Sequence, residues 1–440
     1  PAALGLFLFL PQCLSAASPL ESIASPDPGW PQWRGPRRDG RSLETNLASS
    51  WPEAGPPRLW TATNLGRGYS APIISDGRIY LAGDVGRELH LFALDLEGRL
   101  LWRATNGVSW KNPYPGARAS CALSNQRLFH MNAHGRVACL DPATGRELWS
   151  VNVIERFGGE VPTWALGECL LVDGPRLIVT PGGRDALMAA LDVRTGEVVW
   201  ATEPLRLNQT AHPSLQTLQG KPGETDTAGY GSPILVRWNE RRLLIGCSLR
   251  HTFGVDADTG RLLWARPLQT RYNVVAATPV PCGDSFFVTA PDSSGGRLYG
   301  LRAEGENIIP VPRWTTPLDT CHGGQVLVDG RLYGSYYRAK KGWACLDAAS
   351  GNTLHEFRNL AMGSVLAADG RLYCLSQEGE LVLFEPAPND LVIRGRMRIA
   401  PDSENDAWTH PVILDGRLYL RYHEQLHCYD VRAPHEAVPD

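Results

Sequence analysis

The sequence predicts an all-β protein: an eight-bladed β-propeller in which each blade is a sheet of four antiparallel strands. Three observations lead to this prediction. A hairpin phrase repeats along the chain, a second turn phrase follows it, and the pair recurs about every 47 residues. A repeat of this length that holds four short strands is typical of a propeller blade.

The first phrase predicts a tight hairpin between the first two strands of each unit. Asp-Gly between alternating apolar residues favours a two-residue turn, because both turn residues must adopt a positive φ. The clear copies read DGRIY or DGRLY, and two degenerate copies accompany them. In chain order the copies stand at 76–80, 125–129, 173–177, 329–333, 369–373 and 415–419.

The second phrase predicts a turn between the third and fourth strands. It consists of an aspartate, a glycine four residues later in its commonest form, and an aromatic residue at one position of the outer strand. The glycine supplies the positive φ that such a turn requires. We expect the recurring tryptophans to wedge between neighbouring blades; they are Trp102, Trp149, Trp200, Trp264 and Trp314. For the first unit we expect strands at 70–75, 78–83, 89–95 and 99–104.

The count of units and the two ends of the repeat predict a closed ring. The eight third strands are expected to end near Asp95, Asp141, Asp192, Asp256, Arg302, Asp347, Glu385 and Asp430. The eighth unit lacks a fourth strand, whereas an orphan strand at 58–62 precedes the first unit. We expect these two ends to combine into one blade, since this removes an open sheet edge.

The remaining segments flank this domain at 57–430. Residues 1–17 read as a signal peptide, because an eight-residue apolar run, too short to span a bilayer, leads into small residues at 15–17. The signal is expected to be incomplete, since the chain starts at Pro1. A lipid anchor on Cys13 is not expected, because Pro11 and Gln12 fit a lipoprotein signal poorly. Residues 18–56 are expected to pack their tryptophans onto the propeller, and 431–440 to form a tail.

Charge and composition narrow the possible partners. Lys and Arg number 43 against 46 Asp and Glu, a net charge of −3, so no basic footprint for nucleic acid is present. Because of the predicted signal peptide, we expect an exported protein of the periplasm or cell envelope, with no transmembrane span in the mature chain.

Alignment of the eight inner strands on their hairpins predicts the hub of the ring. One column contains only small residues, as expected where eight backbones converge: Ser70, Ala119, Gly167, Gly231, Ala277, Gly323, Gly363 and Thr409. The column before it is large and varied, which is expected at a channel mouth. It reads Tyr69, Arg118, Leu166, Tyr230, Ala276, His322, Met362 and Trp408.

The channel mouth is the candidate ligand site. Its candidate residues supply aromatic faces, hydrogen-bond donors and one cation; they are Tyr69, Arg118, Trp164, Tyr230, Tyr272, Asn273, His322, Trp408 and His410. A flat, anionic, aromatic ligand would suit them, with Arg118 on a carboxylate. The alternative is that these side chains plug the channel with hydrogen-bonded groups.

Glu168 is the candidate metal ligand. It stands in the column that follows the small one, where a carboxylate near the axis must be paired, protonated or bound to a cation. Calcium is the metal considered, but it needs several oxygen ligands, and the column offers only hydroxyl groups besides.

The blade phrases at 139–149 (CLDPATGRELW) and 190–200 (ALDVRTGEVVW) resemble the pyrroloquinoline-quinone (PQQ)-like repeat family over about 57–430. The lead-in at 30–36, followed by 68–72, resembles exported members from planctomycete-type bacteria. The family includes quinoprotein alcohol dehydrogenases and the BamB outer-membrane assembly scaffold.

The resemblance implies two possible functions. One is a non-catalytic binding or scaffolding propeller of the cell envelope, whose partner is an envelope protein or a small ligand at the channel mouth. The other is an oxidoreductase for an alcohol or sugar, with PQQ and Ca²⁺ on the axis, Glu168 on the metal, Arg118 on a quinone carboxylate, and Trp164 or Trp408 stacked on the ring. Adjacent cysteines, which the dehydrogenases carry, are absent from this sequence. We favour the first function.

Overall fold

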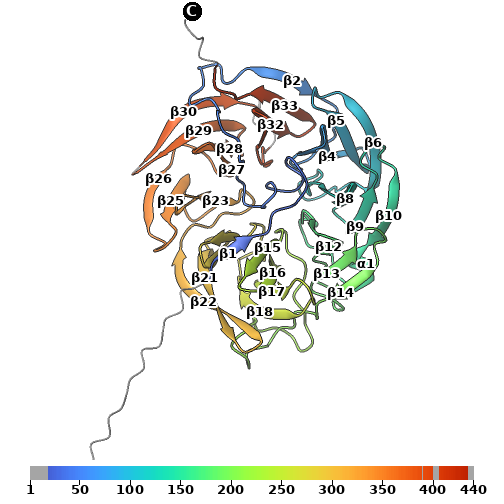
Figure 1. Cartoon of the computed structure of the whole chain (residues 1–440). Helices are drawn as coiled ribbons and strands as arrows, with labels where there is room; N and C mark the ends of the chain where they lie inside the picture. Colours follow the sequence, from blue (N-terminus) through green and yellow to red (C-terminus); the bar gives the residue numbers. More distant parts are fainter. Residues whose placement is uncertain (1–17, 389, 400–405, 435–440) are drawn as a thin grey trace, which may run out of the picture.

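The protein is an eight-bladed propeller in the computed structural model, which describes residues 18–388, 390–399 and 406–434 (Figure 1). The predicted signal peptide and the end of the predicted tail lie outside these residues. In every blade, consecutive antiparallel strands run outward from the axis, and strands from the N-terminal part of the chain are added to blades 4 and 8. The predicted fold class is therefore confirmed.

The strands of blades 1 to 3 are β3 (Ile73–Ser75), β4 (Arg78–Val85), β5 (Glu88–Asp95) and β6 (Leu100–Val108); β7 (Ala122–Ser124), β8 (Arg127–Met131), β9 (Arg136–Leu140) and β10 (Glu147–Asn152); and β11 (Leu171–Asp173), β12 (Arg176–Val179), β13 (Ala189–Asp192) and β14 (Val198–Ala201). Blades 4 to 6 consist of β15 (Ile234–Trp238), β16 (Arg241–Cys247), β17 (His251–Asp256) and β18 (Leu262–Pro267); β19 (Val280–Cys282), β20 (Ser285–Ala290), β21 (Gly295–Glu304) and β22 (Asn307–Thr316); and β23 (Gln325–Val328), β24 (Arg331–Ser335), β25 (Trp343–Asp347) and β26 (Thr353–Phe357). Blades 7 and 8 consist of β27 (Gly363–Ala368), β28 (Arg371–Ser376), β29 (Glu380–Ala387) and β30 (Asp390–Arg398); and β31 (Val412–Leu414), β32 (Arg417–Tyr422), β33 (Gln425–Asp430) and β2 (Arg58–Ala62).

The ring closes as predicted. The orphan strand β2 pairs antiparallel with β33, with Trp60 opposite Cys428, and completes blade 8. The Asp-Gly hairpins adopt the expected conformation: Asp76 and Gly77 have φ values of 50° and 71°. These are the positive angles that a two-residue hairpin turn needs.

The inner strand of blade 1 is shorter than predicted. It starts at Ile73 rather than at residue 70, because Pro72 has no N–H to give to the ladder. The chain before it turns to the neighbouring blade instead, where the Tyr69 N–H donates to the Ala117 carbonyl at 2.7 Å.

Strand β21 is longer than predicted, reaching Glu304 instead of ending near Arg302. A tight turn at Gly305, with φ 60°, lets the β21–β22 ladder continue to the Glu304–Asn307 pair. A short helix, α1 (Val153–Phe157), follows β10; Asn152 caps it by accepting from the N–H groups of Ile154 and Glu155.

The lead-in supplies a strand that the sequence analysis missed. Strand β1 (Leu20–Ser22) pairs with the inner strand β15, so blade 4 has five strands. The lead-in then crosses the centre of the ring, drawn in blue in Figure 1. Its tryptophans Trp30 and Trp51 are 3% and 8% exposed within the core.

Two buried arginines of the lead-in tie the inner strands together. Arg38 donates to the carbonyls of Cys169, Leu170 and Pro233, which belong to blades 3 and 4. Arg34 donates to the carbonyl of Gln325 in blade 6. Carbonyls that turn toward the axis have no ladder partner, so these guanidinium groups satisfy them.

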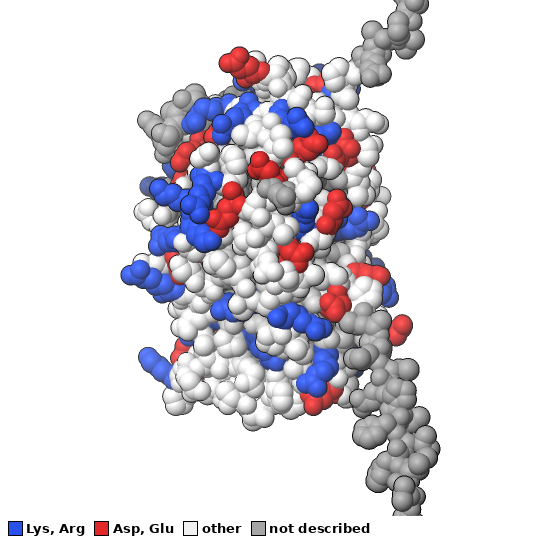
Figure 2. Space-filling view, turned by 90° about the vertical axis from the view of Figure 1, so that its left-hand side faces the viewer, with Lys and Arg blue, Asp and Glu red and all other residues white. Residues whose placement is uncertain are grey.

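The hub is crowded, as the small column predicts. A Cβ added to Gly323 would lie 1.8 Å from the Gly363 carbonyl oxygen, and one added to Gly231 would lie 3.0 Å from that of Ala277. These pairs come from neighbouring blades, so adjacent inner strands nearly touch there. The outer wall differs: basic and acidic side chains are interspersed on the side shown in Figure 2.

Candidate functional site

A cavity of about 530 Å³ lies where the inner strands begin. Its lining contains seven residues of the large column, which come from seven blades: Tyr69, Arg118, Tyr230, Ala276, His322, Met362 and Trp408. Gly167 and Ser232, which stand one and two positions further along the chain than the large column, also line it. The column converges because each blade places the same register position at the axis.

The candidate residues separate into two groups. Those that line the cavity are Tyr69, Arg118, Trp164, Tyr230, Tyr272, His322 and Trp408. Asn273 and His410 are absent from its lining. The lining side chains surround open space, so they do not fill the channel at this level.

His410 supports the cavity from below. Its Nδ1 accepts from Arg34, at 3.3 Å, and its Nε2–H donates to the His322 carbonyl at 3.0 Å. Burial lowers the pKa of His410 to about 3, so the ring is neutral. Trp33 packs edge-on against this ring, with centroids 4.4 Å apart, and donates to Thr278 Oγ1. Trp33 therefore forms the floor of the cavity.

Trp408 is the centre of an aromatic wall. Its ring centroid lies 5.0 Å from Tyr69, 5.2 Å from Tyr114 and 4.9 Å from His322. Burial lowers the pKa of His322 to about 4, so this wall carries no charge at neutral pH. Trp164 and Tyr230 form a second pair, 6.0 Å apart.

Arg118 lines the cavity and donates hydrogen bonds to its own loop. Its Nη1 donates to the Gly116 carbonyl at 2.7 Å, and its Nη2 to those of Pro113 and Tyr114 at 3.1 and 2.6 Å. Burial lowers the pKa of Arg118 to about 10, which still leaves it charged at pH 7. The guanidinium thus holds the loop at 113–116 and is largely committed before any ligand arrives.

Asp319 organises the opposite rim. Its buried carboxylate accepts from the N–H groups of Ser293, Tyr337, Arg338 and Ala339 at 2.8–3.0 Å. One carboxylate thereby fixes two loops, which follow β20 and β24. These loops bring Asp292, Tyr337 and Arg338 to the cavity.

Glu168 is buried, 2% exposed, and lies outside the cavity lining. Both of its oxygens accept hydrogen bonds from Thr180, one from the N–H and one from Oγ1, each at 2.9 Å. Burial raises the pKa of Glu168 to about 7, although these bonds and Arg38 oppose the shift. The carboxylate is used within blade 3.

Several lining residues were not found from the sequence: Trp33, Tyr114, Asp292, Tyr337, Arg338 and Asp406. They belong to the lead-in or to irregular loops, where no strand register assigns them to a column. The run of Pro and Gly around Tyr114 was the one available signal of a tight loop near the mouth.

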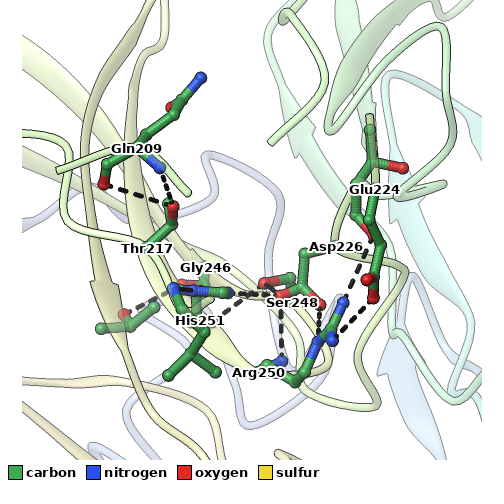
Figure 3. Close-up of polar contacts among 11 residues, drawn as sticks. Gln209, Thr217, Glu224, Asp226, Gly246, Ser248, Arg250 and His251 are labelled. Carbon is green, nitrogen blue, oxygen red and sulfur yellow. Dashed lines mark hydrogen bonds and ion pairs between the residues drawn. The ribbon is translucent and has the colours of Figure 1, made fainter. Parts of the chain in front are cut away.

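A second polar cluster joins Asp226, Ser248, Arg250 and His251 (Figure 3). Ser248 Oγ donates to Asp226 at 2.5 Å, and His251 Nδ1–H donates to it at 2.7 Å. His251 Nε2 accepts from the Leu218 N–H at 3.0 Å. In a hydrolytic triad the serine would instead donate to the histidine.

This cluster is therefore structural. The side chains of His251 and Asp226 are 0% exposed. Burial disfavours the ionised form of Asp226, but hydrogen bonds from His251, Ser248 and Arg250 outweigh it and lower the pKa. The cluster fastens the irregular segment between β14 and β15 to blade 4.

Comparison with known proteins identifies the family. A family model described as outer membrane protein assembly factor BamB, of the PQQ-like repeat type, matches residues 87–357, more than half of the chain. The chain belongs to this PQQ-like propeller family.

The curated relatives of this PQQ-like propeller are longer enzymes. It is 24% identical over 358 residues to polyvinylalcohol dehydrogenase of Sphingopyxis sp. (strain 113P3), covering 70% of this chain and 50% of that one. It is 29% identical over 194 residues to 1-butanol dehydrogenase (quinone) of Thauera butanivorans, covering 40% and 27%. The chain thus spans half or less of these relatives, and neither supports the resemblance to planctomycete members.

Solved structures share the fold. BamB from Moraxella catarrhalis superposes with a TM-score of 0.57 and 12% identity, covering 86% of this chain and 99% of that one. Quinohemoprotein alcohol dehydrogenase from Comamonas testosteroni gives 0.62 and 13%, covering 95% and 82%. Within the described residues, no helix is long and apolar enough to span a membrane.

The residues present do not fit a quinone–calcium centre. Calcium takes about six to eight oxygen ligands, but both oxygens of Glu168 are bonded to Thr180. Over 18–388, 390–399 and 406–434, no three His, Cys, Asp or Glu side chains are grouped to hold a metal. The nine cysteines of these ranges are free, and none adjoins another in sequence.

Proposed function

We propose that this chain is a non-catalytic binding propeller of the bacterial cell envelope, which holds a small ligand in its axial cavity. The observation that carries the proposal is the open cavity of about 530 Å³, lined by aromatic side chains from several blades. Its volume is that of an ordinary ligand site, and a few polar groups among apolar walls are typical of one.

Membership of the BamB-type family supports the location in the envelope and a binding role. Export through the predicted signal peptide belongs to the same proposal. The second candidate is a quinoprotein oxidoreductase acting on an alcohol or sugar, favoured by the curated relatives. The hydrogen bonds of Glu168 and Arg118 argue against this candidate, because both side chains are already bonded to groups of the protein itself.

Titration of the purified protein with PQQ and Ca²⁺ tests the choice. We expect no dye-linked oxidation of ethanol or glucose and no calcium-dependent change in quinone absorbance. Saturable quinone binding with turnover would overturn the proposal. Methanol dehydrogenase reconstituted in the same buffer serves as the positive control.

Ligand binding itself is measured through tryptophan fluorescence, since Trp33, Trp164 and Trp408 line the cavity. Small aromatic ligands are expected to quench it saturably, and Trp408→Ala and Tyr230→Ala to weaken that quenching. Quenching that both variants leave unchanged would place the ligand elsewhere and contradict the proposal.

A further inference from the structure

The cavity offers acceptors rather than free cations. Its charged lining residues are Arg118, Arg338, Asp292 and Asp406. Both terminal nitrogens of Arg118 donate hydrogen bonds to carbonyls of its own loop, three in total. Arg338 is 54% exposed at the rim, and its Nη1 lies 3.3 Å from Asp292 Oδ1. The arginine end of this ion pair is exposed to water, which weakens the attraction and lets Arg338 move away from Asp292.

Asp292 is a buried carboxylate with an unsatisfied oxygen. Its side chain is 5% exposed, and Oδ1 has no hydrogen-bond partner although Arg338 lies near it. Asp292 and Ser293 have φ values of 58° and 64°, which is unusual for two successive non-glycine residues. Asp319 holds this conformation by accepting from the Ser293 N–H. The strained turn thus presents a carboxylate oxygen that forms an ion pair with Arg338 but accepts no hydrogen bond.

Asp406 provides a second hydrogen-bond acceptor in the lining, and its negative charge helps to raise the pKa of Tyr69. Its carboxylate makes no hydrogen bond or ion pair with any residue in the described part of the chain. Burial raises the pKa of both Asp292 and Asp406, because water no longer fully solvates their charged forms. A bound donor would relieve this cost.

The aromatic rings of the rim already accept cations. The guanidinium carbons of Arg271 and Arg338 lie 5.1 and 5.8 Å from the ring centroid of Tyr272. Arg338 also lies 5.1 Å from that of Tyr337. Attraction between a cation and the face of a ring strengthens where water is excluded.

We propose that the cavity binds a small organic cation, an ammonium or guanidinium carried on an apolar or aromatic body, with Asp292 and Asp406 as its counter-ions. The inference deepens the proposed function and rests on it. It reverses the charge of the ligand expected from the sequence, where Arg118 was assigned to a carboxylate. Arg338 is then a competing internal cation at the rim.

Three naphthalene probes of similar size but different charge test the charge of the ligand: 1-naphthylmethylamine, 1-naphthalenemethanol and 1-naphthoate. Calorimetric titration at pH 7 and low salt gives the dissociation constant of each. We expect the amine to bind at least tenfold more tightly than the other two. Asp292→Asn and Asp406→Asn should each weaken the amine by roughly tenfold or more, because a charge-assisted hydrogen bond is lost. Neither should change the affinity for the alcohol.

The substitution Arg338→Gln should change the affinity for the amine in the opposite direction. Removal of the competing guanidinium should tighten the amine, whereas it would weaken an anionic ligand that used Arg338. The loop keeps its anchor in this variant, because Asp319 binds the backbone N–H of Arg338. Asp185→Asn, at a 60%-exposed side chain outside the cavity, is the matched control and should change no affinity.

The outcomes separate the two proposals. If the naphthoate or the alcohol binds most tightly, and Trp408→Ala abolishes that binding, the cation inference is wrong and the binding function stands. If no probe binds, both are wrong. Equal amine affinities in Asp292→Asn, Asp406→Asn and the unaltered protein would also overturn the inference.

Discussion

At the scale of single residues, burial decides what a charged side chain does. Glu168 and Asp226 are both buried carboxylates, yet their pKa values move in opposite directions. Asp226 has three side-chain donors, from Ser248, Arg250 and His251, and stays ionised. Glu168 has Thr180 alone within hydrogen-bonding distance, so desolvation prevails.

Glu168 should make the stability of the protein fall as the pH rises. Its folded-state pKa of about 7 lies above the value of about 4.3 in an unfolded chain. The native state therefore holds the extra proton between these values, and its stability declines over that window before levelling off above pH 7. Glu168→Gln should raise the free energy of unfolding at pH 8 by about 1–3 kcal/mol.

Urea denaturation at pH 5 and pH 8 measures this effect. The gain should be largest at pH 8 and small at pH 5, where Glu168 is already protonated in the native state. A substitution that destabilises equally at both pH values would show that the carboxylate is ionised and well satisfied.

At the scale of elements, indole rings join neighbouring blades. Trp102 donates from Nε1 to the Pro142 carbonyl of the next blade at 3.0 Å, and its ring packs under Gly145. Trp149 and Trp314 repeat this contact against the following blade. Trp60 of β2, which the sequence analysis did not include, does the same across the ring closure.

Two of the predicted tryptophans depart from this geometry. Trp200 packs under Gly260 of blade 4, but its Nε1 has no hydrogen-bond partner. Trp264 stacks on Phe286 of blade 5, with centroids 5.1 Å apart. Both still contact the next blade, as the wedge prediction requires.

The turn glycines should be more sensitive than hairpin glycines with the same backbone conformation. Gly145 has φ 73°, and an added Cβ would lie 2.6 Å from the Trp102 ring; Gly77 has φ 71° and open space around it. Gly77→Ala should cost about 1 kcal/mol through backbone strain alone. Gly145→Ala should cost a further 1–3 kcal/mol, roughly, because the ring must shift.

Comparison of the two variants by urea denaturation isolates the inter-blade contact, since the strain is common to both. Equal losses would mean that the blades move apart freely at this position. When Trp102→Phe is combined with Gly145→Ala, the hydrogen bond to Pro142 is lost but the smaller ring makes room for the added Cβ. The double variant should therefore regain part of the stability that Gly145→Ala loses.

At the scale of the whole molecule, the lead-in acts as an internal brace. It adds β1 to blade 4, places Trp33 under the cavity and inserts Arg34 and Arg38 between inner strands. A ring of blades that contact only their neighbours gains cross-connections from such a segment. The binding cavity therefore depends on residues outside the repeats.

Loss of the hydrogen bonds that the lead-in makes to the inner strands should lower the free energy of unfolding. Arg38→Met leaves the carbonyls of Cys169, Leu170 and Pro233 without their donor, and we expect a loss of about 2–5 kcal/mol in the free energy of unfolding. Arg37→Met, at an exposed neighbouring position, should change it by less than about 0.5 kcal/mol.

Urea denaturation compares the pair, and quenching of cavity tryptophans reports whether the floor is displaced. Equal stabilities of the two variants would show that the lead-in packs on the ring without holding it together.

Sequence alone determined the propeller, its eight blades, the closing strand and the column of residues at the axis. These follow from local turn chemistry and from a repeat that brings equivalent positions to the same radius. Tertiary structure decided the rest: that Arg118 is engaged with its own loop, that Glu168 bonds to Thr180, and that Trp33 and Asp292 reach the cavity. The physical reason is that loops and the lead-in obey no repeat, so the partners of a buried polar group cannot be read from its position in the chain.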